Sequence, residues 1–203
     1  MSRWEVTGIP EGESGRFSIQ ILDYQRVDTE PKGPLSWQTY CKYADLPDGT
    51  YTVLFEAYGP QNAKLNIMQD SPREYKEHKW VTERSGSVLI GGLGIGMINI
   101  PLLASDDITS VTIVEKEQDV IDLVWEHCSK DDRFTLIHAD IDTWEAPEGS
   151  YWDFAWFDTW LTHEEPIEEY IQRMFEKYGD FVGDINGWNW PYIPVKDDSI
   201  QEP

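Results

Sequence analysis

The stretch Ser87-Val88-Leu89-Ile90-Gly91-Gly92-Leu93-Gly94-Ile95-Gly96-Met97 changes abruptly from β-branched and apolar residues to alternating glycines. An apolar segment through Leu103 follows it. The pattern predicts a buried strand, a tight turn and the start of a helix, since glycines let the backbone of such a turn come close to a ligand. The sequence leaves one alternative open, in which the glycines only let the helix pack on the strand.

A second signal follows this turn at the spacing of nucleotide-binding α/β folds. Residues 111–114 (Val-Thr-Ile-Val) predict another strand, which ends in Glu115. In those folds a carboxylate about 20 residues beyond the glycines binds ribose hydroxyls. The glycine turn and Glu115 together therefore predict a nucleoside site.

The chain after the glycine turn alternates between strand and helix patterns. Strands are expected at 134–137 and 152–157, with Asp158 at the end of the latter. Continuously apolar strands joined by helices predict an α/β fold with a Rossmann-like parallel sheet, covered on both faces. Right-handed crossovers place the glycine strand centrally, between strands 111–114 and 152–157. Ligands bind at this switch point, so we expect Asp158 to face the same crevice as the turn glycines, which are Gly92, Gly94 and Gly96.

The first 70 residues form a different pattern. Polar and apolar residues alternate in 16–22, and further strands are expected at 50–55 and 64–69, so we expect a small antiparallel sheet with few helical signals. Ser71-Pro72-Arg73-Glu74 predicts a capped helix that runs toward Trp80. The expected organisation is a β-rich N-terminal appendage (1–70), a nucleoside-binding domain (71–195) and a frayed tail (196–203).

The end of the chain carries one more helix pattern and an unusual tail. Thr162 to Glu165 form a second capping box. Apolar residues at three- and four-residue spacing follow and are expected to be core: Ile167, Tyr170, Ile171, Met174, Phe175 and Tyr178. The aromatic segment 183–192 is expected to pack on the sheet edge, with a cap over the crevice as the alternative.

Composition limits the classes of partner. The chain of 203 residues has 38 acidic and 16 basic residues, a net charge of -22. Without a cluster of Lys and Arg, such a surface repels nucleic acid, and a small cationic molecule or a basic protein suits it better. The same net charge is also explained without any partner, by a need for solubility or by a salty medium. The sequence leaves open whether the protein forms a homodimer.

Other classes are disfavoured by what the sequence lacks. No run approaches the roughly 18 apolar residues of a membrane span, and the polar start is no signal peptide, so we expect a cytoplasmic protein. Cys41 and Cys128 suggest neither a disulfide framework nor a zinc site. No metal is expected, because the histidines show no ligand spacing and are interpreted as satisfied or surface residues: His78, His127, His138 and His163.

Residues 88–96 resemble the glycine motif, G-x-G-x-G, of the S-adenosylmethionine-dependent methyltransferase superfamily. The resemblance implies S-adenosylmethionine, or its decarboxylated form, as cofactor. It also implies that Glu115 holds the ribose, that Asp140 accepts a hydrogen bond from the adenine amine and that Ile141 packs on the adenine ring. Nicotinamide-dependent oxidoreductases share the glycine turn and the ribose-binding acid. Their motif, G-x-G-x-x-G, fits less well, because the last glycine of this chain falls one residue early.

Within that superfamily the chain is similar to the spermidine-synthase-like branch and to short viral proteins of that kind. The similarity includes residues 66–74, where the resemblance implies that Gln69 faces the nucleoside. Polyamine synthases have acids that bind the amine where this chain has Ile95 and Leu161, although Glu164 or Glu165 could substitute. The later strands of the full fold are expected to be missing or to be replaced by the tryptophan-rich tail, which gives a C-terminally abbreviated methyltransferase-type sheet.

These observations favour methyl transfer to an unidentified small acceptor. Asp158 is the expected catalytic residue, as a base or as a group that orients the acceptor. Aminopropyl transfer to a polyamine is the first alternative. The second is a non-catalytic module that keeps the nucleoside pocket and engages a partner protein through its acidic surface.

Overall fold

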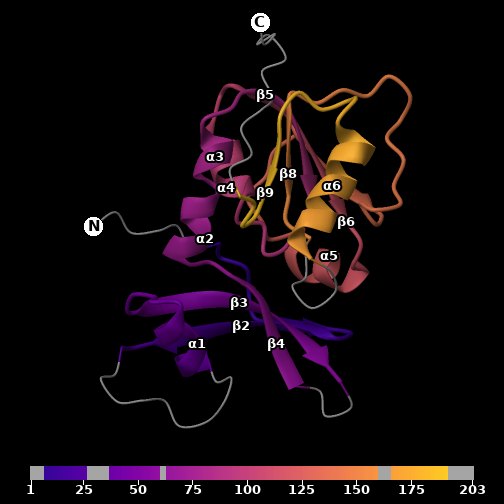
Figure 1. Cartoon of the computed structure of the whole chain (residues 1–203). Helices are drawn as coiled ribbons and strands as arrows, with labels where there is room; N and C mark the ends of the chain where they lie inside the picture. Colours follow the sequence, from indigo (N-terminus) through magenta and orange to yellow (C-terminus); the bar gives the residue numbers. More distant parts are fainter. Residues whose placement is uncertain (1–6, 27–36, 60–62, 160–165, 192–203) are drawn as a thin grey trace, which may run out of the picture.

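The computed structural model describes residues 7–26, 37–59, 63–159 and 166–191. They form two sheets, a four-stranded antiparallel sheet in the order β1-β2-β3-β4 and a five-stranded parallel sheet in the order β7-β6-β5-β8-β9. Figure 1 shows the antiparallel sheet, in indigo and purple, below the parallel sheet. Together they give the expected α/β architecture.

The elements of the antiparallel sheet and of the segment that leads out of it are the following: β1 Gly12–Ser14, β2 Phe17–Tyr24, α1 Trp37–Tyr43, β3 Gly49–Tyr58, β4 Ala63–Gln69, α2 Pro72–Glu77 and α3 Lys79–Thr82. Those of the parallel sheet are the following: β5 Gly86–Gly91, α4 Asn99–Ala104, β6 Ile108–Glu115, α5 Gln118–Val124, β7 Phe134–His138, β8 Phe154–Phe157, α6 Ile167–Tyr178 and β9 Ile185–Gly187.

The glycine strand β5 occupies the centre of the parallel sheet, as predicted. Leu89 of β5 lies opposite Thr112 of β6 on one side and opposite Ala155 of β8 on the other. The order β7-β6-β5-β8-β9 corresponds to the order 3-2-1-4-5 of doubly wound sheets, in which ligands bind where the direction of winding reverses. That switch point lies between β5 and β8, and it brings Gly92 next to Asp158.

Alternate residues of β5 pack on opposite faces of this sheet, because successive side chains of a strand point to opposite sides. Val88 and Ile90 belong to the core beneath α3, α4 and α5. Leu89 belongs to a second core beneath α6, with Tyr170 and Met174. Figure 1 shows α6 on the side of the sheet away from α3 and α4. The parallel sheet is therefore covered on both faces, as predicted.

The antiparallel sheet is joined to the parallel one by a shared core. Phe17, Ile19 and Leu54 lie in the same apolar cluster as Val120 and Val124 of α5. A boundary at residue 70 separates the two sheets along the chain, yet this cluster extends across it.

Two helices of the first half differ from the sequence predictions. The structure contains the helix α1, which the sequence patterns of the first 70 residues did not predict. Trp37, Tyr40, Cys41 and Ala44 meet one face of the antiparallel sheet at three- and four-residue spacing, in a cluster whose centre is Tyr51. The single helix expected from Ser71 to Trp80 is two short helices, α2 and α3, which meet at His78.

Two details of the second half also differ. The tail adds a fifth parallel strand, β9, which pairs with β8. Phe175, expected in the core, is 39% exposed, because it lies at the edge of the buried face of α6, where its ring packs against that of Trp190. The capping box at 162–165 and the tail 196–203 lie outside the described residues; α6 begins after Pro166.

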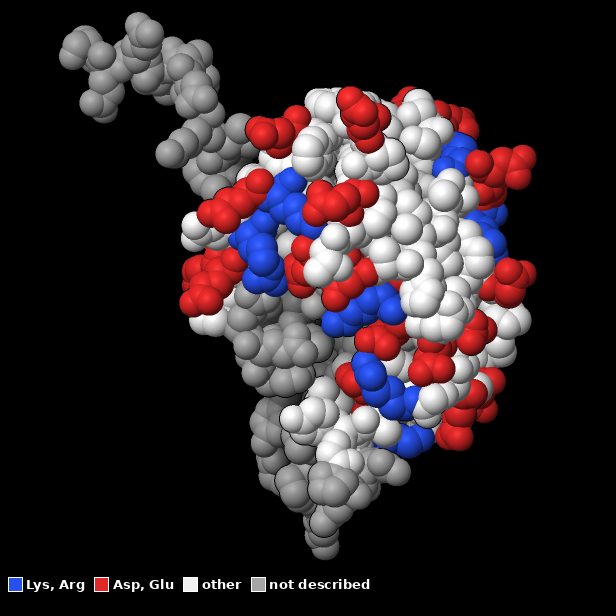
Figure 2. Space-filling model, turned by 90° about the vertical axis from the view of Figure 1, so that its right-hand side faces the viewer, with Lys and Arg blue, Asp and Glu red and all other residues white. Residues whose placement is uncertain are grey.

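The surface beside α6 mixes both charges. On the face shown in Figure 2, basic side chains lie among acidic ones. Arg173 pairs with Asp142 at 3.0 Å, and Lys177 lies 3.7 Å from Glu145. Among the described residues, no helix is long and apolar enough to cross a membrane.

Candidate functional site

The turn after β5 depends on three glycines with positive φ. The φ angles of Gly92, Gly94 and Gly96 are +94°, +52° and +66°, values that favour glycine. Their surroundings differ. A Cβ on Gly94 would lie 2.5 Å from the sulfur of Met68, whereas one on Gly96 would lie 2.5 Å from Cβ of Cys128. Gly96 therefore lets the turn pack on the segment after α5, while Gly92 and Gly94 line the cavities described below.

Glu115 ends β6 beside this turn and is 7% exposed. One carboxylate oxygen accepts a hydrogen bond from the backbone N–H of Leu93, and the other accepts one from Glu117, both at 2.8 Å. Burial raises its pKa. An ionised carboxylate has about four acceptor positions, so these two bonds leave capacity for hydroxyl donors.

A cavity of about 240 Å³ opens at the carboxyl ends of β5, β6, β7 and β8. It brings together six of the residues that the sequence predicted to form a site: Gly92, Gly94, Glu115, Asp140, Ile141 and Asp158. We call it the large cavity. The antiparallel sheet contributes its other wall, which includes Phe17, Tyr58 and Ile67.

Arg16 is a lining residue of the large cavity that the sequence analysis did not select. Its guanidinium lies 2.7 Å from Glu56 of β3 and 2.6 Å from Glu117, which follows β6. It thus joins the antiparallel sheet to the rim of the large cavity. Residues 16 and 117 are far apart along the chain, and no local pattern signals such a pair.

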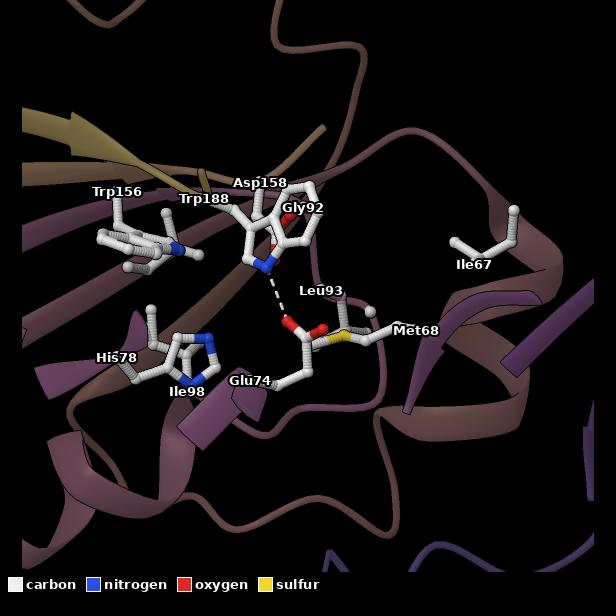
Figure 3. Close-up of a pocket in the computed structure, with 12 residues that line it drawn as sticks. Ile67, Met68, Glu74, His78, Gly92, Leu93, Ile98, Trp156, Asp158 and Trp188 are labelled. Atoms are coloured by element: carbon white, nitrogen blue, oxygen red, sulfur yellow. Dashed lines mark hydrogen bonds between the residues drawn. The ribbon is translucent and has the colours of Figure 1, made fainter. Parts of the chain in front are cut away.

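A second cavity, of about 100 Å³, adjoins the first. We call it the small cavity. The two share four lining residues: Ile67, Gly92, Gly94 and Asp158. Figure 3 shows the small cavity with its polar residues, which come from α2, from the α2–α3 junction, from β8 and from the segment after β9.

Asp158 follows β8 and borders both cavities. Its backbone N–H donates to the carbonyl of Gly91 at 3.0 Å, which holds it against the glycine turn. Its carboxyl group has no hydrogen bond to another described residue. Burial, and then the charge of Glu74, raise the pKa of this carboxyl to about 7. A group of this kind can hold or release a proton near neutral pH.

Glu74 of α2 is a second buried carboxyl, 5% exposed. The sequence identified it only as part of a capping box, and the structure shows that Ser71 does cap the helix at the backbone N–H of Glu74. The Glu74 carboxylate instead accepts hydrogen bonds from Gln69 at 2.9 Å and from the indole of Trp188 at 2.6 Å. Burial raises its pKa.

Gln69, expected to face the nucleoside, lines neither of these two cavities. It is 2% exposed, and its amide nitrogen donates to Glu74 and to the hydroxyl of Ser71. Its amide oxygen accepts from Asn66 at 3.1 Å. In this structure Gln69 therefore supports Glu74, and the contact with a nucleoside stays a prediction.

His78 corrects the interpretation of the histidines as satisfied or surface residues. It is 1% exposed, and neither ring nitrogen has a partner among the described residues. Burial lowers its pKa to about 4, so the ring is neutral at pH 7. Its ring meets that of Trp156 edge to face, with centroids 5.8 Å apart, and the indole nitrogen of Trp156 also has no described partner. Among the described residues, no group of three His, Cys, Asp or Glu is placed to hold a metal.

The tail both packs on the sheet edge and covers a cavity, so the expectation and its alternative both apply. Residues 185–187 form β9 at the sheet edge, and Trp188 then turns over the small cavity to reach Glu74. The sequence signalled an aromatic tail but could not show which residue would reach α2, since 114 positions separate the two partners.

Comparisons with family models and with curated proteins find no match. Solved structures do resemble the chain. A putative methyltransferase from Escherichia coli is 12% identical, with a TM-score of 0.45, over 68% of this chain and 84% of that one. A putative RNA methyltransferase from Pyrococcus horikoshii is 14% identical, with a TM-score of 0.42, over 58% of this chain and 56% of that one.

Human methyltransferase-like protein 13, solved in complex with SAH, is 19% identical, with a TM-score of 0.39, over 52% of this chain and 54% of that one. The chain thus spans a little over half the length of the archaeal and human proteins. At these identities a likeness concerns the fold alone, and what the site does depends on the residues described above.

Proposed function

We propose that the protein transfers the methyl group of S-adenosylmethionine to a small acceptor. One observation carries the proposal: the glycine turn, Glu115 and the Asp140–Ile141 segment line a single cavity at the switch point of a parallel sheet, and Asp158 joins it to a second cavity. A donor site and an acceptor site that meet at one carboxyl group suit a two-substrate transfer.

The residues of the large cavity fit an adenosine moiety. Glu115 keeps acceptor capacity for the two ribose hydroxyls. Asp140 accepts the backbone N–H of Asp142 through Oδ1 at 2.9 Å, which leaves Oδ2 to accept from the adenine amine. Ile141 offers an apolar contact beside it. The rest of the donor would extend over Gly92 and Gly94 toward Asp158.

The sulfonium group supplies the electrophilic methyl when it is bound, so the protein needs only to position an acceptor in line with it and to receive a proton. Asp158 is placed for both tasks, since it borders both cavities. Its raised pKa lets it take up a proton near neutral pH.

Aminopropyl transfer is the alternative that the same cavity invites. Against it, Ile95 is fully buried in the core and offers an amine no ligand. Leu161 lies outside the described residues. In its favour, Glu74 places a second buried carboxyl beside the small cavity. Methyl transfer and aminopropyl transfer use different donors, so binding distinguishes them.

Isothermal titration with S-adenosylmethionine, its decarboxylated form, SAH and NAD tests the proposal. We expect S-adenosylmethionine and SAH to bind. Glu115→Gln should weaken SAH binding roughly 10- to 150-fold, because it removes charge-assisted hydrogen bonds. The exposed Glu126→Gln is the matched control and should change nothing.

A second variant tests the place of binding by volume. Gly94→Trp should abolish binding because its side chain would fill the cavity, whereas Gly149→Trp, at a glycine with φ of +79° and open space around it, should not. Preference for the decarboxylated donor would support aminopropyl transfer. Stabilisation by SAH without turnover of any acceptor would support a non-catalytic nucleoside-binding module. Absence of binding by S-adenosylmethionine and SAH would refute the proposal.

A further inference from the structure

The small cavity sets a limit on the size of the molecule that enters it. Its volume is about 100 Å³. A single water needs at least roughly 10 to 15 Å³ of such space, so the cavity admits several non-hydrogen atoms, about the size of a small ring with a short substituent. Most of its wall is apolar, with Ile67, Met68, Leu93 and Ile98 among the residues that line it. The occupant is therefore compact, with an apolar body.

One end of the small cavity is acidic. Both oxygens of Glu74 already accept hydrogen bonds, from Gln69 and from Trp188. Asp158 has no such partner among the described residues, so it is the carboxyl available to a ligand. A half-buried carboxylate without a donor is costly, and an N–H donor, above all a charged one, would relieve that cost.

Another part of the wall holds donors that an amine alone cannot satisfy. The indole N–H of Trp156 only donates, and the neutral ring of His78 carries one donor and one acceptor. In Figure 3 the indole nitrogen of Trp156 and a ring nitrogen of His78 are turned toward the space that Trp188 and Glu74 bound. An alkyl diamine brings only donors when it is protonated, so it would leave these N–H groups unpaired.

We propose that the small cavity binds the methyl acceptor, a compact amine whose apolar body also carries a hydrogen-bond acceptor such as a ring nitrogen. The amine donates to Asp158, and the acceptor group receives the N–H of Trp156 or of His78. This inference rests on the proposed function, because it assigns the second substrate of the same transfer. It also excludes simple polyamines as that substrate, because they carry no hydrogen-bond acceptor when protonated.

The transfer step balances with the groups present. The bound ammonium gives one proton to the Asp158 carboxylate and becomes a neutral amine. Its lone pair forms the new N–C bond to the methyl carbon, and the C–S bond breaks with its electron pair on sulfur, which yields SAH. The products are a methylated ammonium, a protonated Asp158 and a neutral thioether, so charge and atoms are conserved.

A matched set of four ligands tests the inference. Benzylamine and the three isomers of (aminomethyl)pyridine have the same eight non-hydrogen atoms and differ only by one ring nitrogen. Titrated into the full chain saturated with SAH, at least one pyridine isomer should bind roughly 5- to 150-fold more tightly than benzylamine, the ratio that one unpaired buried donor implies. That isomer should also bind more tightly than 1,4-diaminobutane.

Two variants identify which group donates a hydrogen bond to the ring nitrogen. Trp156→Phe or His78→Phe should bring the ratio of the pyridine isomer to benzylamine close to one. Trp80→Phe is the control, since Trp80 packs 5.9 Å from the Trp156 ring but lines neither of the two cavities, and it should leave the ratio unchanged. Binding of benzylamine itself reports that each variant is folded.

Two outcomes overturn the inference. The first is SAH binding with no isomer preferred over benzylamine, or with 1,4-diaminobutane bound most tightly, and it leaves the proposed function intact. The second is a preference that persists in both Trp156→Phe and His78→Phe. Failure of SAH to bind in the first titration would instead count against the proposed function, and the acceptor assignment would fall with it.

Discussion

Replacing Asp158 with asparagine should make the folded protein more stable above neutral pH while it lowers methyl transfer. Asparagine has nearly the shape of aspartate but no charge, so it removes the cost of burying a carboxylate at the junction of the two cavities. Burial and the nearby Glu74 raise the pKa of Asp158 from 3.8 to about 7. The wild-type protein carries that cost whenever the carboxyl is ionised.

The sign and size of the effect follow from the raised pKa. Below pH 3.8 the carboxyl is protonated in both the folded and the unfolded chain, and it has no effect on stability. Between about pH 4 and pH 7 the folded state binds more protons, so the free energy of unfolding falls as the pH rises. A pKa difference of about three corresponds to about 4 kcal/mol. Because the cavity admits solvent, we expect about 2 kcal/mol of this to be realised.

Urea unfolding of the wild type and of Asp158→Asn, measured from pH 4 to pH 8, checks this prediction. The variant should gain stability relative to the wild type as the pH rises. The ionisable groups near Asp158 include Glu74 and Tyr170, whose pKa values are also raised, and His78, which lines the same small cavity and is neutral above about pH 4. All three are present in the two proteins. A difference that does not change with pH would refute the reasoning.

Two further predictions concern the contacts that shape the cavities. The Trp188→Phe and Glu74→Leu changes should show a coupling energy of about 1.5 to 3 kcal/mol in a double-mutant cycle of urea unfolding, since one removes the donor and the other the acceptor of one charge-assisted hydrogen bond; additive effects would contradict it. Gly96→Ala should lower the melting temperature more than Gly149→Ala, because both glycines have positive φ but only Gly96 would bring a Cβ within 2.5 Å of Cys128; equal losses would show that the contact does not matter.

The sequence predicted the parallel sheet because its signals are local. Apolar runs such as 87–91 and 111–114 indicate buried strands, and the right-handed crossover rule then orders them without any knowledge of side-chain contacts. The same rule brought Asp158 to the glycine turn. Gly92, Gly94 and Glu115 followed from the glycine turn and from the end of the next predicted strand, whereas Asp140 and Ile141 came from the resemblance to a known family.

The small cavity could not be predicted in this way. Glu74 and His78 lie on or beside a short helix whose sequence signals only a cap, and their burial depends on Trp188, which a three-residue strand brings back to α2. No spacing rule joins residues so far apart along the chain. The resemblance assigned Gln69 to the nucleoside, a contact that stays a prediction, whereas its hydrogen bond to Glu74 is visible only in the structure.

The apolar cluster that joins the two sheets has a consequence for how the protein unfolds. Phe17, Ile19 and Leu54 are as deeply buried as Val120 and Val124, against which they pack. Melting the antiparallel layer would strip α5 of its cover and expose the hydrophobic interior of its neighbour, so both halves should unfold in one cooperative transition. A graft of residues 71–191 onto another scaffold would then need a replacement for that cover before the large cavity could form.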